Sequence, residues 1–186
     1  MKILSKLKYP GIIAVWLVTL YFIFSVLNIF LADVSFSKGI NNGSIKDLTD
    51  ATKLNPREET YHRNLGLAYA ILTKNETDQD LKQALVTLSD QEMQTAVNLN
   101  SQNSLVLKSA ISGYNYLGTV NKSYFDKAKK IATDLTKLSP TDPEAWYQLA
   151  TVEAKIGDKT QAAKDYKKTL ELKNDLISFP IIELGL

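Results

Sequence analysis

The sequence predicts an all-α protein: one N-terminal transmembrane helix followed by a short α-solenoid of about three helical hairpins. An uncharged apolar run at residues 11–32 is long enough for a helix to cross a membrane. Helical apolar patterns then recur between Leu-x-Pro junctions at residues 54–56 and 138–140, and residues 141–174 hold a nearly complete helix–turn–helix pattern. The expected parts are a basic stub with the membrane helix at 1–35, a helical repeat domain at 36–176 and an apolar cap at 177–186.

The apolar run reads GIIAVWLVTLYFIFSVLNIFLA, which is 22 residues without a charge. A helix of that length spans about 33 Å, compared with about 30 Å for a bilayer's hydrocarbon core. A buried soluble helix is one alternative, but a helix this long without a polar face does not suit so small a domain. A removable signal peptide is another, but its apolar region is usually shorter and residues 30–32 make a poor cleavage site. We therefore expect a retained membrane helix.

The lysines at the two ends of this helix predict its orientation. Lys2, Lys6 and Lys8 precede it, and only Lys38 lies equally close on the other side. More lysines follow downstream, so the wider count is nearly balanced. The positive-inside rule places the N-terminus in the cytoplasm and the repeat domain outside, with a single pass through the membrane.

One face of the membrane helix gathers small and hydrogen-bonding residues. Tyr21, Ser25 and Asn28 lie on it at helical spacing. Such a stripe favours packing against another membrane helix, either a second copy or a partner's. The alternative is that Asn28 meets the lipid headgroups and Ser25 bonds its own backbone. The whole stripe comprises Ala14, Val18, Tyr21, Ser25, Asn28 and Ala32.

Residues 141–174 predict two helices joined by a turn at Gly157. Their apolar positions are Trp146, Leu149 and Ala150, then Ala162, Tyr166, Leu170 and Leu172. These positions resemble the tetratricopeptide repeat (TPR) pattern. The resemblance implies a TPR-type α-solenoid, in which each unit buries its apolar face against its neighbours. The sequence departs from the pattern at Glu153, where an aromatic residue is usual, at Thr169 and at Asn174.

Earlier units follow from the same pattern. Residues 65–69 read LGLAY, a close copy of the core of a first helix, and the polar residues 73–80 predict a lengthened turn after it. The middle unit begins near Ser104 and has a turn lengthened over 118–123. Residues 44–54 predict a lone second helix ahead of the first full unit. The C-terminal LISFPIIELGL is apolar and is expected to cover the last hairpin, with partner binding as the alternative.

No catalytic, cofactor or metal site is predicted, and the chain is not expected to be an enzyme. His62 is the only histidine and there is no cysteine, so a transition-metal site would lack its usual ligands. Phosphate-loop and nucleophile-elbow motifs are absent from the sequence. His62 is expected to be a packing or surface residue, and Lys127, Lys129 and Lys130 a solvated helix face. A net charge of +2 does not favour a nucleic-acid partner.

The TPR resemblance implies a concave surface, lined by the first helices, that binds protein partners. Arg63, Lys108 and Lys155 would make it basic, which favours an acidic peptide or an anionic glycan; an ordinary solvent-facing row is the simpler explanation. Leu67 stands where family members that hold a peptide carboxylate have Asn, so that ligand is not predicted. The whole predicted surface comprises Arg63, Asn64, Leu67, Lys108, Ser112, Tyr116, Tyr147, Thr151 and Lys155.

A second resemblance covers most of the chain. The membrane helix, then LADVSFSKG, then KLNPREETYHRNLGLAYA is similar to the C-terminal end of bacterial O-antigen ligase and polymerase family membrane proteins. It implies the bacterial cytoplasmic membrane and transfers no active-site residue. Two functions follow. One is a membrane-anchored, non-catalytic TPR scaffold. The other is an accessory part of an envelope glycan ligase or polymerase whose catalytic core lies in another chain.

Overall fold

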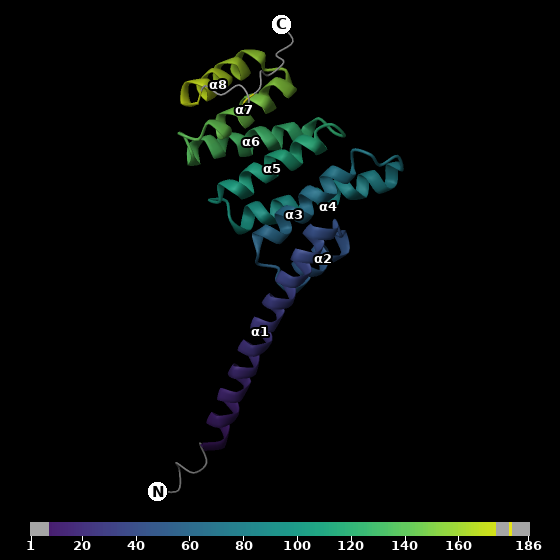
Figure 1. The fold of residues 1–186 in the computed structure, drawn as a ribbon, viewed down its shortest axis with the longest axis vertical. Coiled ribbons are helices and arrows are strands. Elements are labelled where there is room, and N and C mark those ends of the chain that lie inside the picture. Colours follow the sequence, from purple (N-terminus) through teal and green to yellow (C-terminus); the bar gives the residue numbers. More distant parts are fainter. Residues whose placement is uncertain (1–7, 174–178, 180–186) are drawn as a thin grey trace. The chain divides into compact units, whose positions relative to one another are not determined.

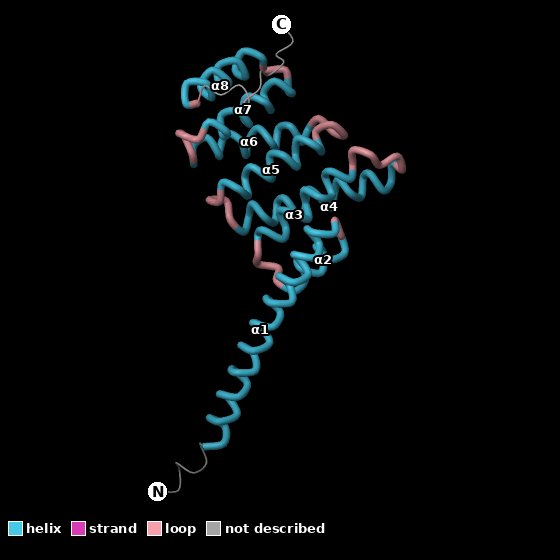
Figure 2. Tube along the Cα trace, viewed as in Figure 1, coloured by secondary structure: helices cyan, strands magenta, loops and turns pink. Residues whose placement is uncertain are grey.

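The computed structural model describes residues 8–173 and residue 179. This part of the chain forms eight helices and no strand, as predicted (Figures 1 and 2). The chain divides into two compact units, residues 1–56 and 57–186. The helices are α1 (Lys8–Asn42), α2 (Ile45–Leu54), α3 (Glu59–Leu72), α4 (Gln79–Leu99), α5 (Ser104–Leu117), α6 (Ser123–Leu138), α7 (Pro143–Ile156) and α8 (Lys159–Leu172).

Helix α1 dominates the first unit (Figure 1). Its large apolar side chains from Ile12 to Leu31 are exposed all round. A stretch of it, Gly11–Asn42, is long and apolar enough to span a membrane by length and composition. Apolar side chains on every face are typical of helices that are surrounded by lipid or by other protein.

The end of α1 packs against α2, so the second helix predicted at 44–54 is not alone. Ala32, Leu48 and Ala51 are buried in this unit. Gly39 lies so close to α2 that a Cβ there would sit 2.7 Å from Leu48 Cγ. Ser44 begins α2 by accepting a hydrogen bond from the Asp47 amide. Because α1 is continuous to Asn42, the predicted boundary at residue 35 falls inside a helix, and the apolar segment continues directly into a helix pair.

Three hairpins form the second unit: α3 with α4, α5 with α6, and α7 with α8. The first helices lie side by side, since α3 contacts α5 and α5 contacts α7. Helix α5 is central, and Leu107, Ile111 and Tyr114 on its buried face belong to one continuous core. Small residues at Ala110, Ala128, Ala132 and Ala145 are fully buried and allow the helices to approach closely.

The first hairpin differs from its sequence-based prediction. Its turn occupies only residues 73–78, and the remaining extra residues lengthen α4 to 21 residues, compared with 14 in α3. Asp78 caps α4 by accepting hydrogen bonds from the amides of Asp80 and Leu81. Leu85 is buried, so the added turns of α4 have an apolar anchor. The polar residues 79 and 80 were predicted to belong to the turn, but the Asp78 cap and the buried Leu85 make them the start of α4.

The last hairpin follows the TPR pattern closely. Pro143 occupies the first turn of α7, where a helix tolerates proline. Gly157 ends α7 with a φ of 90°, a left-handed conformation that favours glycine. The Trp146 indole donates a hydrogen bond to the Pro140 carbonyl at 2.9 Å, which ties α7 to the preceding junction. Ala150 and Ala162 are fully buried between the two helices.

Candidate binding site

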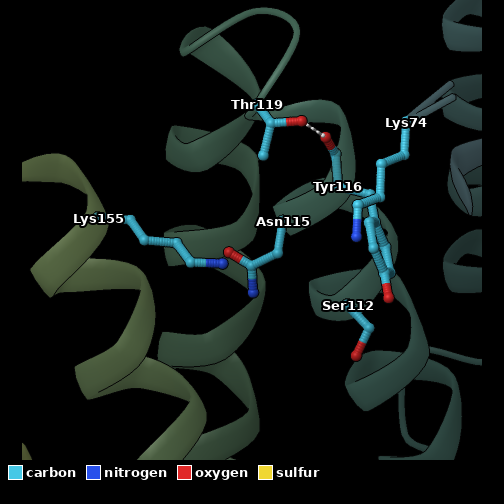
Figure 3. Close-up of a pocket in the computed structure, with 6 residues that line it drawn as sticks. All are labelled: Lys74, Ser112, Asn115, Tyr116, Thr119 and Lys155. Carbon is cyan, nitrogen blue, oxygen red and sulfur yellow. Dashed lines mark hydrogen bonds between the residues drawn. The ribbon is translucent and has the colours of Figure 1, made fainter. Parts of the chain in front are cut away.

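One cavity of about 600 Å³ opens where the first helices of the three hairpins end (Figure 3). Three residues of the predicted concave surface line it: Ser112, Tyr116 and Lys155. The sequence analysis did not assign its other lining residues, which are Lys74, Asn115 and Thr119. The remaining members of the predicted surface do not line this cavity.

Local helix geometry positions these side chains. Ser112 and Tyr116 are four residues apart on α5, so they share a face. Thr119 follows the end of α5, and its hydroxyl donates to the Tyr116 carbonyl at 2.7 Å (Figure 3). Lys74 follows the end of α3, and Lys155 lies in the last turn of α7. The carbonyl ends of helices carry partial negative charge and attract cations, which explains lysines at both places.

Lys155 has no compensating acid in this cavity. Part of its side chain is exposed, but the surrounding helices desolvate the amine, and this burial lowers the pKa of Lys155. Its Nζ lies 5.8 Å from the centroid of the Phe125 ring. Figure 3 shows the Asn115 and Lys155 side chains pointing toward each other across the cavity. The Asn115 Oδ1 atom is buried and has no hydrogen-bond partner.

Lys108, predicted as part of the basic surface, is instead neutralised. Its Nζ pairs with Asp142 at 2.9 Å and with Glu144 at hydrogen-bond distance. Burial opposes the charge of Lys108, but the hydrogen bonds to Glu144 and Asp142 outweigh it and raise the pKa of Lys108. Asp142 also caps α7 through the Glu144 amide. Lys108 therefore joins α5 to the start of α7.

Lys127 lies on a partly solvated face, as predicted, with 43% of its side chain exposed, but it is also paired with an acid. Its Nζ lies 2.8 Å from both carboxylate oxygens of Asp90, so it links α6 to α4. Asp90 also accepts a hydrogen bond from the Tyr114 hydroxyl at 3.0 Å. Lys127 lies over the rings of Tyr114 and Tyr124, which stack on each other. Burial first, and then the charge of Asp90, raise the pKa of Tyr114. These contacts close the junction between the first two hairpins.

Lys129 closes the next junction in the same way. Its Nζ lies 3.2 Å from Glu153 on α7 and 3.4 Å from Asp158. The Glu153 side chain is only 2% exposed, and one of its oxygens, Oε2, has no hydrogen-bond partner. Burial and the neighbouring Asp165 carboxyl raise the pKa of Glu153 to about 7, against the lowering effect of Lys129. The departure from the TPR pattern at Glu153 thus places an acid inside the last hairpin.

The predicted surface residues at the two ends of the stack lie elsewhere. On α3, Asn64 donates to the carbonyl of Thr60, and the buried Nε of Arg63 has no partner. On α7, Tyr147 packs against Phe179, with ring centroids 5.4 Å apart. Phe179 is buried, and its carbonyl accepts a hydrogen bond from the Tyr166 hydroxyl.

Phe179 is the one described residue of the predicted cap at 177–186; the others lie outside the described residues. Also on α7, the Thr151 hydroxyl donates to the Tyr147 carbonyl at 2.8 Å. Leu67 of α3 packs against the core of the second unit. The predicted concave row therefore comprises packing residues as well as open ones.

His62 is buried, and its Nδ1 lies 2.6 Å from the Glu92 carboxylate, so it joins α3 to α4. Within the described part of the chain, no three His, Asp or Glu side chains gather in a way that could hold a metal ion.

On α1, the Ser25 hydroxyl donates to the Tyr21 carbonyl of its own helix at 2.9 Å. This bond agrees with the alternative for Ser25, and the packing stripe of Tyr21, Ser25 and Asn28 stays a prediction.

Comparisons with known proteins resolve the fold. No family model matches the sequence, and no curated protein matches it. Among solved structures, a thermophilic TPR protein in Thermus thermophilus matches with a TM-score of 0.62 at 20% identity, over 82% of this chain and 75% of that chain. The chain has a TPR-type fold.

Two further solved structures agree. MamA matches with a TM-score of 0.59 at 17% identity, over 83% of this chain and 81% of that chain. The structure MamA MSR-1 C2 matches with a TM-score of 0.55 at 17% identity, over 81% and 77%. Identities this low establish the TPR architecture and no finer property. The resemblance to O-antigen ligases receives no support from these comparisons.

The cavity residues missed by the sequence analysis had a weak signal. Thr119 lies three residues after Tyr116, and Lys74 is the first charged residue after α3. Their positions past the helix ends fall outside the repeat pattern, which describes helices and not their terminal turns. A search of the terminal turns of the first helices for lysines would have added Lys74 to the predicted Lys155.

Proposed function

We propose that this protein is a membrane-anchored, non-catalytic TPR scaffold that binds protein partners through the first-helix face of its repeat stack. One observation carries the proposal: the cavity at Ser112, Tyr116 and Lys155 receives residues from the ends of three successive first helices. A surface built by several repeats suits an extended partner chain, which is how stacked repeats form binding sites. Among the described residues that line the cavity, no lysine forms a hydrogen bond with a hydroxyl, so the lining shows no activated nucleophile and binding explains it better than catalysis does.

The anchor in this proposal is α1. Its exposed apolar side chains between residues 11 and 32 match the thickness of a bilayer. We place it in a bacterial cytoplasmic membrane in a single pass, with the lysines at its start in the cytoplasm and the repeat stack outside. Only a short linker joins α2 to α3, so the repeat stack is tethered to the anchored unit and can meet partners in the same membrane. A second membrane helix is a further partner for the Tyr21, Ser25 and Asn28 stripe.

Site-specific photocrosslinking in native membranes tests the scaffold function. A photoreactive residue replaces Tyr116 at the cavity in one variant, and Lys167 on the exposed face of α8 in a matched control. We expect discrete protein adducts from position 116 that are absent at position 167. The same adducts at both positions, or none at position 116, would contradict partner binding at the first-helix face.

Alkaline extraction and protease protection test the anchor separately. We expect the full chain to stay with the membrane pellet and the repeat stack to be cut by a protease added outside the cell membrane. Release of the chain by alkali would contradict the anchor. Protection of the repeat stack from the external protease, in intact cells without an outer membrane, would contradict the proposed orientation.

A further inference from the structure

The lysines between the hairpins differ in whether an acid lies beside them. Lys108, Lys127 and Lys129 each meet at least one carboxylate within 3.4 Å. Lys74 and Lys155 line the cavity with no acid beside them, and neither forms an ion pair with another described residue. Two cations around one cavity of about 600 Å³ repel each other unless an anion lies between them.

Unpaired polar groups point to the same cavity. Asn115 Oδ1 is buried without a hydrogen-bond partner, which disfavours the empty state. The hydroxyls of Ser112 and Tyr116 lie on the same side of the cavity as Lys74 (Figure 3). Amide, hydroxyl and ammonium groups together can surround a small anionic group with hydrogen bonds. The Asn115 Oδ1 atom is an acceptor and needs a donor, such as a backbone amide of a bound chain, whereas the two lysines need an anion. The missing component is therefore an anionic chain segment that also presents backbone amides.

The place of the cavity in the fold favours a carboxylate over a phosphate. It lies at the carbonyl ends of α3, α5 and α7, where the helix dipoles present partial negative charge. Phosphate sites in proteins instead use helix N-termini, whose amides point at the anion, or forked arginines. No arginine lines this cavity. Two lysines offset the single charge of a carboxylate here better than the double charge of a phosphate.

We infer that this cavity binds an aspartate or glutamate side chain of an extended acidic peptide segment, held between Lys74 and Lys155. The inference rests on the proposed scaffold function and names the chemistry of its partner. The Ser112 hydroxyl donates to the same segment, and the Asn115 Oδ1 atom accepts from one of its backbone amides. The cavity volume exceeds that of one side chain, so the neighbouring residues of the peptide also enter it.

A peptide titration on the full chain in detergent micelles tests this inference. The probe is a blocked peptide in which glutamate alternates with glycine, and the comparison peptide has glutamine in place of glutamate. Saturable NMR shifts of residues near Ser112 and Tyr116 report binding even when it is as weak as about 1 mM. We expect the glutamate peptide to bind at least about 10-fold more tightly than the glutamine peptide, with weaker binding at high salt.

Matched variants place the binding in this cavity. Lys74→Gln with Lys155→Gln should weaken glutamate-peptide binding about 10-fold or more, because both partners of the carboxylate are lost. Lys164→Gln with Lys167→Gln removes the same charge from an exposed face of α8 and should leave the affinity unchanged. Circular dichroism checks that both double variants stay folded.

Two results overturn the inference: equal affinity for the two peptides or no saturable shift up to about 1 mM, and equal weakening in both double variants. Failure here is distinguishable from failure of the scaffold function. If adducts still form at position 116 while the glutamate peptide does not bind, the scaffold stands and the acidic partner falls. If adducts are absent too, both fall.

Discussion

Lysines lie both at the junctions between the hairpins and at the cavity beside them, but their surroundings differ. At the junctions, Lys127 and Lys129 each contact an acid, Asp90 and Glu153 respectively, while their own side chains stay partly exposed. At the cavity, Lys155 meets no carboxylate. The lysines all lie on short helices of one repeat stack. An acid across the junction distinguishes the paired lysines from Lys155, and neither the number nor the spacing of the lysines in the sequence reveals which of them have one.

This comparison predicts opposite responses to mutation. The protein loses stability when one partner of a lysine–acid pair at a junction is removed, because the other partner stays partly buried and unpaired. A lysine without an acid partner, such as Lys155, can be neutralised with little loss of stability, because no ion pair is broken and only its contact with the Phe125 ring is lost; we expect binding to weaken instead. The predictions below test this contrast, beginning with the largest expected effect.

Asp90→Ala should produce the largest loss of stability. The change leaves the buried Tyr114 hydroxyl without its acceptor and Lys127 without its carboxylate, which costs about 2–3 kcal/mol. Chemical unfolding of the full chain in detergent, followed by circular dichroism, measures it. The matched control is Asp134→Ala, whose pair with Lys137 is exposed and is expected to contribute less than about 0.5 kcal/mol. Equal losses in the two variants would show that the Asp90 junction is not closed.

Glu153 should make the stability depend on pH. In the folded protein the pKa of Glu153 is raised from 4.5 to about 7 by burial and by Asp165, so between these pH values the folded state holds the extra proton. Its stabilising contribution is complete below about pH 4.5 and is lost as the pH rises through about 7. The expected loss of unfolding free energy from pH 5 to pH 8 is about 2 kcal/mol.

Glu153→Gln isolates this effect from other titrating groups, because glutamine keeps the shape of the side chain and carries no titratable proton. Subtracting the variant's pH profile from that of the wild type leaves the contribution of Glu153 alone. We expect the difference to fall steadily between pH 5 and pH 8. Parallel profiles would mean that the buried carboxyl is charged throughout and that Lys129 fully compensates it.

Lys155→Gln should have the smallest effect on stability, within about 0.5 kcal/mol of the wild type, because it breaks no ion pair and removes a desolvated charge. Lys129→Gln, which removes the partner of the buried Glu153, should cost about 1 kcal/mol or more at pH 8. Thermal unfolding of the two variants at that pH measures the contrast. A larger loss for Lys155→Gln would identify it as a structural residue.

The fold was predictable where packing between repeats requires apolar or small residues at regular spacing in the sequence. The last hairpin needs Leu149, Ala150 and Ala162 at fixed helical positions, and all three are buried. The length of α4 was not predictable, because residues 79 and 80 are polar in either a loop or a helix and the Asp78 cap decides between them. The pairing of α1 with α2 was not predictable from an apolar pattern, because the two helices approach closely at Gly39, which has no side chain that would mark a packing position.

The candidate site was predictable only in part. The TPR pattern gave the helix face, and hence Ser112, Tyr116 and Lys155. It could not separate Lys108 from Lys155, since both are lysines on first helices. The acids that neutralise Lys108 come from the following unit, after a junction whose geometry the sequence does not record. Charge pairing across repeats is a tertiary property, so the open cation appeared only in the structure.

The most direct test of this contrast is the pKa of individual lysines, measured by NMR of the side-chain εCH₂ and amine groups in the full chain in detergent. Burial lowers the pKa of Lys155, and we predict a value below the ordinary lysine value of 10.5 that rises when the glutamate peptide is added. For Lys108 and Lys129, burial is outweighed by their carboxylate partners, so both should titrate above 10.5. A Lys155 pKa at or above those of Lys108 and Lys129 would contradict the distinction between closed junctions and an open site.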